Sequence, residues 1–279
     1  MPSELFPSNP LRTSRLRYVS EEREEIVYAP PTGRPLGTNR AFTTCARILI
    51  PILATFTKRD WIGTHNIPAS GPAIVISNHV SYADVLFFAQ FLYKNGRAPR
   101  FIGKQSVFDV PIIGRIILAA GQIPVDRESA TASKALAHAV ACLKAGHLIG
   151  IYPEGTLTRD ENLWPMVAKT GAARLAILTR NPIIPVAAWG PAKVLPRYGK
   201  RVHLFPRTKV TLRAGDPIDL SAWYGKADDQ AALVEATAFM MKKLTDLVAQ
   251  IRGETPPEII FDPRTSDLPR TGNFKKGKK

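Results

Sequence analysis

The chain has 279 residues, of which 45% are hydrophobic, and a formal net charge of +15 at pH 7. This length and apolar content suffice to bury a sizeable core and fit one large domain or two small ones, of which we expect one domain with tails. The two cysteines, Cys45 and Cys142, have no CxxC or metal-ligand spacing, which argues against a disulfide framework or a metal site and favours a reducing, cytosolic environment.

Most of the excess positive charge lies in the central part of the chain, because residues 41–253 hold 26 basic and 14 acidic side chains. A basic domain indicates an anionic partner, which could be nucleic acid, an anionic membrane surface or a phosphorylated substrate. Aromatic residues make up 8% of the chain and are not interleaved with Lys and Arg as a base-stacking platform requires. We therefore expect no nucleic-acid partner.

Two segments precede the first predicted strand. Residues 1–40 are rich in Pro, Arg and Glu, which predicts disorder and offers no apolar stretch for a signal peptide. Residues 41–58 contain the apolar run ILIPILATF, which is shorter than the roughly 20 residues needed to cross a bilayer. With Arg40, Arg47 and Lys58 around it, this run is equally consistent with a helix at the membrane interface and with a core helix.

Short apolar runs alternate with helix-length segments over residues 41–253. The predicted strands are 73–77, 100–103, 148–152, 183–189 and 209–215, and the predicted helices are 81–94, 131–145, 167–179 and 229–252. Near-continuous apolar strands separated by helices predict an α/β domain with a central, mostly parallel sheet covered by helices on both faces. The basic residues 254–279 are predicted to form a disordered tail.

The sequence ISNHVSYAD (76–84) places a histidine just after the predicted strand 73–77. Ser81 and Asp84 have the spacing of a helix N-cap and a first-turn carboxylate, so a purely structural role would explain both. If His79 lies in the turn, however, the Asp84 carboxylate reaches one imidazole nitrogen and leaves the other to accept a proton. Sites of this kind lie at the carboxyl ends of the strands in α/β proteins.

A second group of polar residues follows the strand 148–152 in the sequence IYPEGTLTRD. Gly155 permits a close backbone approach, Thr156 offers a hydroxyl and Arg159 adds positive charge, a combination suited to a phosphate group. The loop lacks the GxxxxGK[ST] pattern of a nucleotide-binding P-loop. The alternative is an ordinary turn with Glu154 in solvent.

Two further cations follow other predicted strands, Lys104 after 100–103 and Arg127 after the apolar run QIPV. Because parallel strands end at one edge of a sheet, both side chains are expected near His79. The order and spacing of these groups are more informative than any one of them.

Together the blocks resemble the 1-acyl-sn-glycerol-3-phosphate acyltransferase family over about residues 45–220. Four sequence blocks of that family occur here in the family's order. They are N-H-x4-D (Asn78, His79, Asp84), a glycine with a distant arginine (Gly114, Arg127), F-P-E-G-T-R (Tyr152, Pro153, Glu154, Gly155, Thr156) and V-P-V (around Pro185).

The resemblance implies direct transfer of an acyl chain from acyl-CoA or acyl carrier protein to lysophosphatidic acid, giving phosphatidic acid without a metal or other cofactor. His79 would be the general base and Asp84 would orient it. The acceptor phosphate would be held by Lys104, Arg127, Glu154, Gly155, Thr156 and Arg159. It also implies a glycerolphosphate-acyltransferase-like fold with an N-terminal membrane-interface helix, in a peripheral or monotopic protein at the cytoplasmic face of the cell membrane.

One departure leaves the acceptor open, because Leu157 stands where the family has an arginine. Phosphate binding then shifts to Arg159 or Arg127, or the acceptor is larger than lysophosphatidic acid. Glycerol 3-phosphate and other lysophospholipids are alternative acceptors. A basic stretch between Lys193 and Arg213 favours contact with an anionic membrane surface. A non-catalytic module that binds anionic lipid or nucleic acid is the alternative from another class.

Overall fold

The fold is known from a computed structural model, which describes residues 26–125, 131–266 and 273. A seven-stranded sheet crosses the domain in the order β1-β7-β6-β2-β5-β3-β4. All neighbouring strands are parallel except β6 and β7, which are antiparallel. The strands are β1 (Thr57–Ile62), β2 (Ala73–Ser77), β3 (Pro99–Lys104), β4 (Ile123–Val125), β5 (Leu148–Ile151), β6 (Ile183–Trp189) and β7 (Thr208–Ala214).

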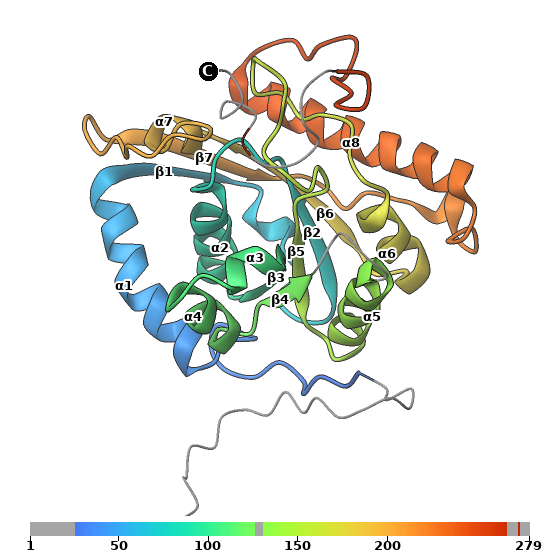
Figure 1. The fold of residues 1–279 in the computed structure, drawn as a ribbon, viewed down its shortest axis with the longest axis horizontal. Helices are drawn as coiled ribbons and strands as arrows, with labels where there is room; N and C mark the ends of the chain where they lie inside the picture. Colours follow the sequence, from blue (N-terminus) through green and yellow to red (C-terminus); the bar gives the residue numbers. More distant parts are fainter. Residues whose placement is uncertain (1–25, 126–130, 267–272, 274–279) are drawn as a thin grey trace, which may run out of the picture.

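Helices cover both faces of this sheet (Figure 1). They are α1 (Arg40–Phe56), α2 (Asp84–Lys94), α3 (Gln105–Phe108), α4 (Ile113–Ala119), α5 (Thr131–Lys144), α6 (Gly171–Thr179), α7 (Pro191–Val194) and α8 (Gln230–Arg252). Single-turn 3-10 helices lie at Thr64–Asn66 and Ser221–Trp223. The predicted fold class, a mostly parallel sheet between helices, is confirmed.

The central strand β2 contributes to a core on each side of the sheet. Ile74 and Ile76 pack with residues of α5, α6 and α8, whereas Ala73 and Val75 pack with residues of α2. Successive side chains of a strand point to opposite faces, so a strand covered on both faces needs apolar residues throughout. This requirement explains why the run AIVIS is apolar without interruption.

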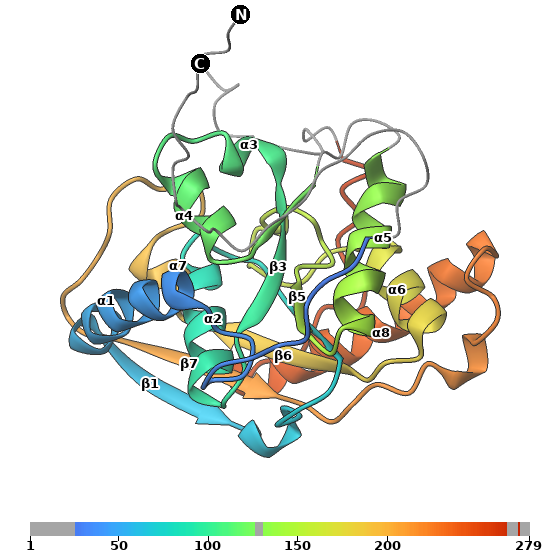
Figure 2. The same cartoon turned by 90° about the horizontal axis from the view of Figure 1, so that it is seen from below.

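The strands β2, β3 and β5 end at one edge of the sheet, since they are mutually parallel. Figure 2 shows β3 running to the edge from which the α3–α4 segment leaves. The loops that follow β2 and β5 begin at the same edge. The residues predicted to form a site are therefore carried by neighbouring strand ends.

The five predicted strands and four predicted helices are all present, with shifts of a few residues at their ends. The helix α2 begins at Asp84 rather than at Ser81. Two strands were not predicted. One is β1, whose sequence TKRDWI holds three charges because it is an edge strand with largely exposed side chains, and the other is the three-residue β4.

The N-terminal segment predicted to be disordered is placed against the domain from residue 26 onward. Tyr28 Oη lies 3.0 Å from His138 Nδ1 of α5. Residues 1–25 lie outside the described residues.

The C-terminal segment is also placed against the domain over residues 254–266, where it was predicted to be disordered. The Val167 N–H donates to the Phe261 carbonyl at 2.9 Å. Residues 267–272 and 274–279 lie outside the described residues.

The apolar segment 41–58 forms most of α1 and the first two residues of β1. Phe42 and Ala46 are buried against the domain, while Ile48 and Ile52 are about half exposed at 58% and 48%. The helix therefore combines the two expected properties, a packed face and an exposed apolar face. No described helix is long and apolar enough to span a membrane.

Candidate active site

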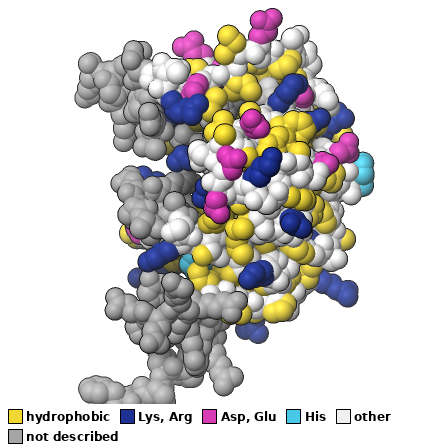
Figure 3. Space-filling view, turned by 90° about the vertical axis from the view of Figure 1, so that its right-hand side faces the viewer, with side chains coloured by type: hydrophobic (Ala, Val, Ile, Leu, Met, Phe, Trp, Pro, Cys, Tyr) yellow, Lys and Arg dark blue, Asp and Glu magenta, His cyan; other side chains and the backbone are white. Residues whose placement is uncertain are grey.

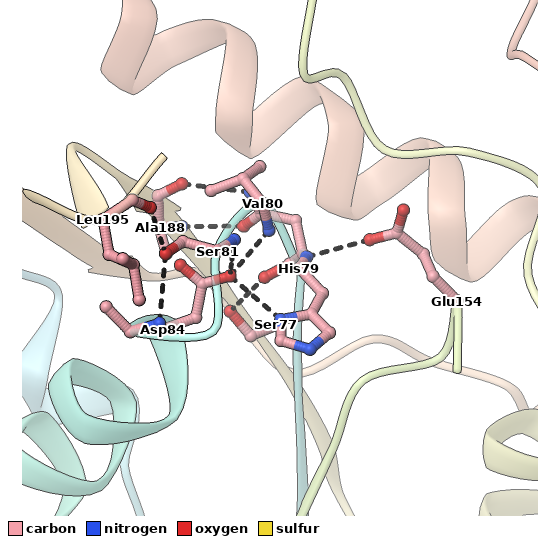
Figure 4. Close-up of polar contacts among 10 residues, drawn as sticks. Ser77, His79, Val80, Ser81, Asp84, Glu154, Ala188 and Leu195 are labelled. Carbon is pink, nitrogen blue, oxygen red and sulfur yellow. Dashed lines mark hydrogen bonds and ion pairs between the residues drawn. The ribbon is translucent and has the colours of Figure 1, made fainter. Parts of the chain in front are cut away.

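The turn after β2 holds His79 beside Asp84 (Figure 4). His79 follows the strand at the carboxyl edge of the sheet, and Asp84 opens α2. His79 Nδ1 lies 3.0 Å from Asp84 Oδ2. The aspartate side chain is 1% exposed and the histidine side chain 13%. The structure thus brings together the two residues that the sequence predicted to act as a pair, with the imidazole as the accessible member.

A single oxygen of Asp84 accepts three hydrogen bonds. In addition to His79 Nδ1, the Val80 N–H donates to Oδ2 at 2.6 Å and the Ser81 N–H at 2.8 Å. These backbone donors fix the carboxylate, which can only accept a hydrogen bond from the imidazole. His79 Nδ1 therefore carries a proton, and Nε2 has a lone pair directed away from the aspartate.

Asn78 and Ser81 fix the turn to the rest of the domain. The Asn78 amide pairs with Ala188 of β6, accepting from its N–H at 2.8 Å and donating to its carbonyl at 3.0 Å. The Ser81 hydroxyl donates to the Leu195 carbonyl at 2.6 Å and accepts from the Ala83 N–H at 3.0 Å. Asn78 and Ser81 therefore hold the histidine turn in shape through these hydrogen bonds. Neither side chain is directed at a reacting group.

Glu154 binds the backbone of His79, which corrects its predicted place in a phosphate site. Oε1 accepts from the His79 N–H at 2.9 Å and Oε2 from the Met166 N–H at 3.2 Å. The residue is 3% exposed. The Thr158 N–H also donates to the His79 carbonyl at 2.7 Å. The loop after β5 therefore holds the main chain of His79 on both sides.

The electrostatic state of Glu154 follows from its burial. Burial raises the pKa of this carboxyl group to about 8, although the two backbone N–H donors lower it. The nearby charge of Asp84 raises the pKa further. Glu154 is therefore mainly protonated at pH 7, and Asp84 remains the principal negative charge beside the imidazole.

Tyr152 is a site residue to which the sequence analysis assigned no role. Its ring stacks on the His79 imidazole with centroids 4.1 Å apart and an interplanar angle of 21°. The ring also contacts Phe88 and Phe101. Burial raises the pKa of the Tyr152 hydroxyl well above its usual value, so the group stays neutral. The sequence signal that could have identified Tyr152 is its position. It is an aromatic residue directly after β5, the strand that lies next to β2 and its histidine turn.

The predicted phosphate-binding residues are only partly gathered. Lys104 ends β3 and is exposed at the edge where His79 lies. Gly155 and Thr156 form the turn after β5 and are partly exposed. Gly155 has φ +71°, a conformation that favours glycine. Arg127 lies outside the described residues.

Arg159, which was predicted to add positive charge to a phosphate site, is turned into the domain. It is 1% exposed, and its guanidinium donates to the Leu157 carbonyl at 3.3 Å and to the Tyr198 hydroxyl. Leu157, at the position of the family arginine, is also 1% exposed. The loop therefore buries both positions, because its backbone folds back toward the segment that contains Tyr198.

Comparison with known proteins gives consistent matches. The sequence profile of the Acyltransferase family matches residues 58–189. A chloroplastic 1-acyl-sn-glycerol-3-phosphate acyltransferase of Brassica napus is 32% identical over 143 residues, 50% of this chain and 40% of that protein. A Bacillus subtilis protein described as 1-acyl-sn-glycerol-3-phosphate acyltransferase is 27% identical over 212 residues, 74% of this chain and 98% of its own length.

The fold has a counterpart among solved structures. The crystal structure of the 1-acyl-sn-glycerophosphate acyltransferase PlsC from Thermotoga maritima has a TM-score of 0.58 and 20% identity, covering 77% of this chain and 81% of that chain. This chain spans about two fifths of the length of the plant relatives. The family profile runs from β1 to the end of β6 and includes both loops around His79, so residues 58–189 match the acyltransferase family.

Proposed function

We propose that this protein acylates the free hydroxyl of lysophosphatidic acid to give phosphatidic acid in phospholipid biosynthesis, with acyl-CoA or acyl carrier protein as the donor. The observation that carries this proposal is the His79–Asp84 pair, joined at 3.0 Å at the carboxyl edge of the sheet. Relatives described as 1-acyl-sn-glycerol-3-phosphate acyltransferases support the choice of substrate. A thiolate leaves readily, so the proposed reaction needs no metal or other cofactor.

In the proposed mechanism His79 is the general base. Nε2 accepts the proton of the attacking hydroxyl while the oxygen bonds to the thioester carbonyl carbon. The tetrahedral intermediate collapses with cleavage of the C–S bond, and the thiolate takes the proton from the imidazolium. Asp84 stabilises the imidazolium that exists between these two transfers. The histidine is regenerated and no acyl-enzyme forms.

The acceptor phosphate is held by Lys104, Arg127, Gly155 and Thr156 in this proposal. Lys104 and the Gly155–Thr156 turn follow β3 and β5, which are neighbours at the edge where His79 lies. Holding a remote phosphate positions the hydroxyl against the base and so converts binding energy into rate. Glu154 is not part of this set, because both of its oxygens are engaged by backbone N–H groups.

The proposed site of action is the anionic, cytoplasmic face of the membrane, contacted by α1 and residues 200–207. The loop 200–207 meets the end of α1, where Arg207 Nη2 donates to the Ala54 carbonyl at 2.8 Å and Phe205 packs edge-on against Phe56. Phe205 is 75% exposed. We call this the α1–loop surface. Its exposed cations are Arg40, Arg47, Lys200, Arg201 and Arg207.

The test is thiol release from palmitoyl-CoA with and without oleoyl-lysophosphatidic acid. We expect acceptor-dependent release from the wild type, its loss in His79→Ala, and its retention in His65→Ala, which removes an exposed histidine elsewhere. His79→Ala should still bind the acceptor, because the phosphate contacts are separate from the base. Equal loss of turnover and acceptor binding would contradict the assignment of the base.

A second acceptor class is favoured by one feature of the loop after β5. The family arginine is replaced by the buried Leu157, and a lysophospholipid acyltransferase of Arabidopsis thaliana, LPEAT1, is 32% identical over 124 residues, 41% of this chain and 28% of that protein. Assaying lysophosphatidic acid, glycerol 3-phosphate and other lysophospholipids side by side separates these acceptors. No turnover with any acceptor and either donor would favour a lipid-binding module without catalysis.

A further inference from the structure

The segment between β3 and β4 carries an apolar surface of its own. It consists of α3, α4 and the turn that joins them. Five large apolar side chains are exposed on it, and we call them the α3–α4 patch: Val107 (46%), Val110 (42%), Ile112 (71%), Ile113 (53%) and Ile116 (44%). Contiguous exposed apolar side chains mark interaction sites more often than isolated ones do.

The opposite side of the same segment is already packed. Phe108 is 8% exposed, and a Cβ added at Gly114 would lie 1.8 Å from the Phe108 carbonyl oxygen. A Cβ at Gly103 would lie 2.9 Å from the Phe108 ring. α3, α4 and the end of β3 are therefore in close contact, which fixes the direction of the patch. An ordinary surface helix is apolar on one face only, whereas this segment is apolar on both.

The backbone at the tip of the segment is strained. Ile112 has φ +67° and ψ −58°, a conformation that β-branched residues rarely adopt, and it is the most exposed member of the patch. Such strain persists only where the surrounding structure enforces it. The Ile112 side chain adds little to the core in return, so the structure holds an apolar group outward at a conformational cost.

The patch lies beside the α1–loop surface. The Asn39 side chain at the start of α1 donates to the Ala119 carbonyl at the end of α4, at 2.7 Å. Figures 1 and 2 both show α1 and α4 side by side. α3 follows directly from Lys104, at the edge of the sheet where His79 lies. The patch therefore connects the proposed membrane-binding surface with the mouth of the site.

Charge distinguishes this region from the face on the side of α6 and α8. Residues 105–121 contain only two charged side chains, Asp109 and Arg115, and Asp109 accepts from the Gln105 amide at 2.9 Å. On the α6 and α8 side, Lys, Arg, Asp and Glu are mixed among apolar side chains (Figure 3). An apolar patch continuous with a basic surface matches the acyl-chain and headgroup layers of an anionic bilayer.

We propose that the α3–α4 patch inserts into the acyl-chain layer of an anionic bilayer as a second anchor, separate from α1. This inference rests on the proposed function. Two anchors on neighbouring sides of the sheet edge hold the His79 site against one leaflet. A lysophospholipid then reaches the base from the leaflet without its acyl chain crossing water.

The test uses vesicles of phosphatidylcholine with phosphatidylglycerol and measures co-sedimentation of the full chain. The double variant Ile112→Asp/Ile113→Asp is expected to bind at least about tenfold more weakly than the wild type, because charges replace the methyl and methylene groups that the bilayer would bury. Val234→Asp on α8, where the valine is 47% exposed, is the matched control and should bind like the wild type.

A second variant separates binding from folding. Ile112→Gly suits φ +67°, so its Tm should equal or exceed that of the wild type, while its vesicle binding should fall severalfold. As a direct probe, brominated lipids should quench the fluorescence of the tryptophan introduced by Ile112→Trp. They should not quench that of the tryptophan introduced by Val234→Trp. Vesicle binding needs no turnover, so a failure of this inference can be distinguished from a failure of the proposed function.

Three results would overturn the proposal. One is unchanged vesicle binding in both Ile112→Asp/Ile113→Asp and Ile112→Gly. Another is intact vesicle binding with lost turnover on a water-soluble short-chain acceptor, which would make the patch a wall of the substrate site. The third is a wild-type dimer in solution that the double variant converts to a monomer, which would make a second copy of this chain the occupant.

Discussion

Asp84→Asn separates the negative charge of this residue from its geometry. All hydrogen bonds of the side chain end on Oδ2, and an amide oxygen in that place accepts the same three donors. The amide NH2 then occupies the position of Oδ1, which is buried and has no hydrogen-bond partner among the described residues. The turn around His79 should keep its shape while the charge beside the imidazole disappears.

The size of the effect follows from the 3.0 Å separation. At an effective dielectric constant of about 20, unit charges at this distance attract by about 5 kcal/mol. His79 is neutral before it takes the proton, so this attraction develops only on the way to the transition state. About 1.4 kcal/mol corresponds to tenfold in rate. If Asp84→Asn loses half to most of this attraction, kcat should fall by about 10²- to 10³-fold.

The assay is thiol release at saturating acceptor, with Tm measured on the same preparations. Asp84→Asn should lose about 1–3 kcal/mol of stability for the unsatisfied buried NH2, or a few degrees in Tm. Asp84→Ala is the comparison, because it removes the acceptor for all three donors and should unfold at a lower temperature. A kcat of Asp84→Asn within about threefold of the wild type would refute a role for the carboxylate charge.

Two other predictions concern Glu154 and Phe205. The folded state keeps the Glu154 proton up to about pH 8, while the unfolded chain releases it near pH 4.5, so the free energy of unfolding should fall between these pH values, by at most about 1.4 kcal/mol per pH unit. Glu154→Gln does not titrate and should lack this slope in urea denaturation at pH 5, 6.5 and 8; parallel profiles would contradict the raised pKa. Phe205→Asp should weaken binding to phosphatidylglycerol vesicles about tenfold without affecting turnover of a soluble acceptor, with Val27→Asp as the exposed control. Equal sedimentation of the two variants would argue against the α1–loop surface.

The parts of the fold that the sequence could predict are those with local signals. β2 and β6 are covered on both faces, so their apolar runs are uninterrupted and identify them as strands. β1 was missed because an edge strand needs no such run, and TKRDWI reads as a polar connection. The pairing of His79 with Asp84 was accessible because both lie in one strand-to-helix turn, five residues apart.

The parts of the site that could not be predicted depend on long-range folding. From the sequence of the turn alone, Glu154 is expected to lie in solvent. It becomes buried because the residues up to Met166 fold back over the loop and supply a second backbone donor. The inward direction of Arg159 likewise depends on Tyr198, which is 39 residues away. Composition at these positions indicates a phosphate-binding loop, but partners distant in the sequence decide which side chains are available to a ligand.

The register of two strands explains why the histidine turn and the loop after β5 act together. β2 and β5 are parallel neighbours with Ile76 opposite Ile151. His79 and Glu154 each lie three residues beyond these partners, so the Glu154 side chain reaches the backbone N–H of His79 despite 75 residues of separation. A slip of one residue in this pairing would turn β5 over and carry Glu154 away from the His79 N–H. The 154–158 loop therefore controls the position of the base through the main chain of His79.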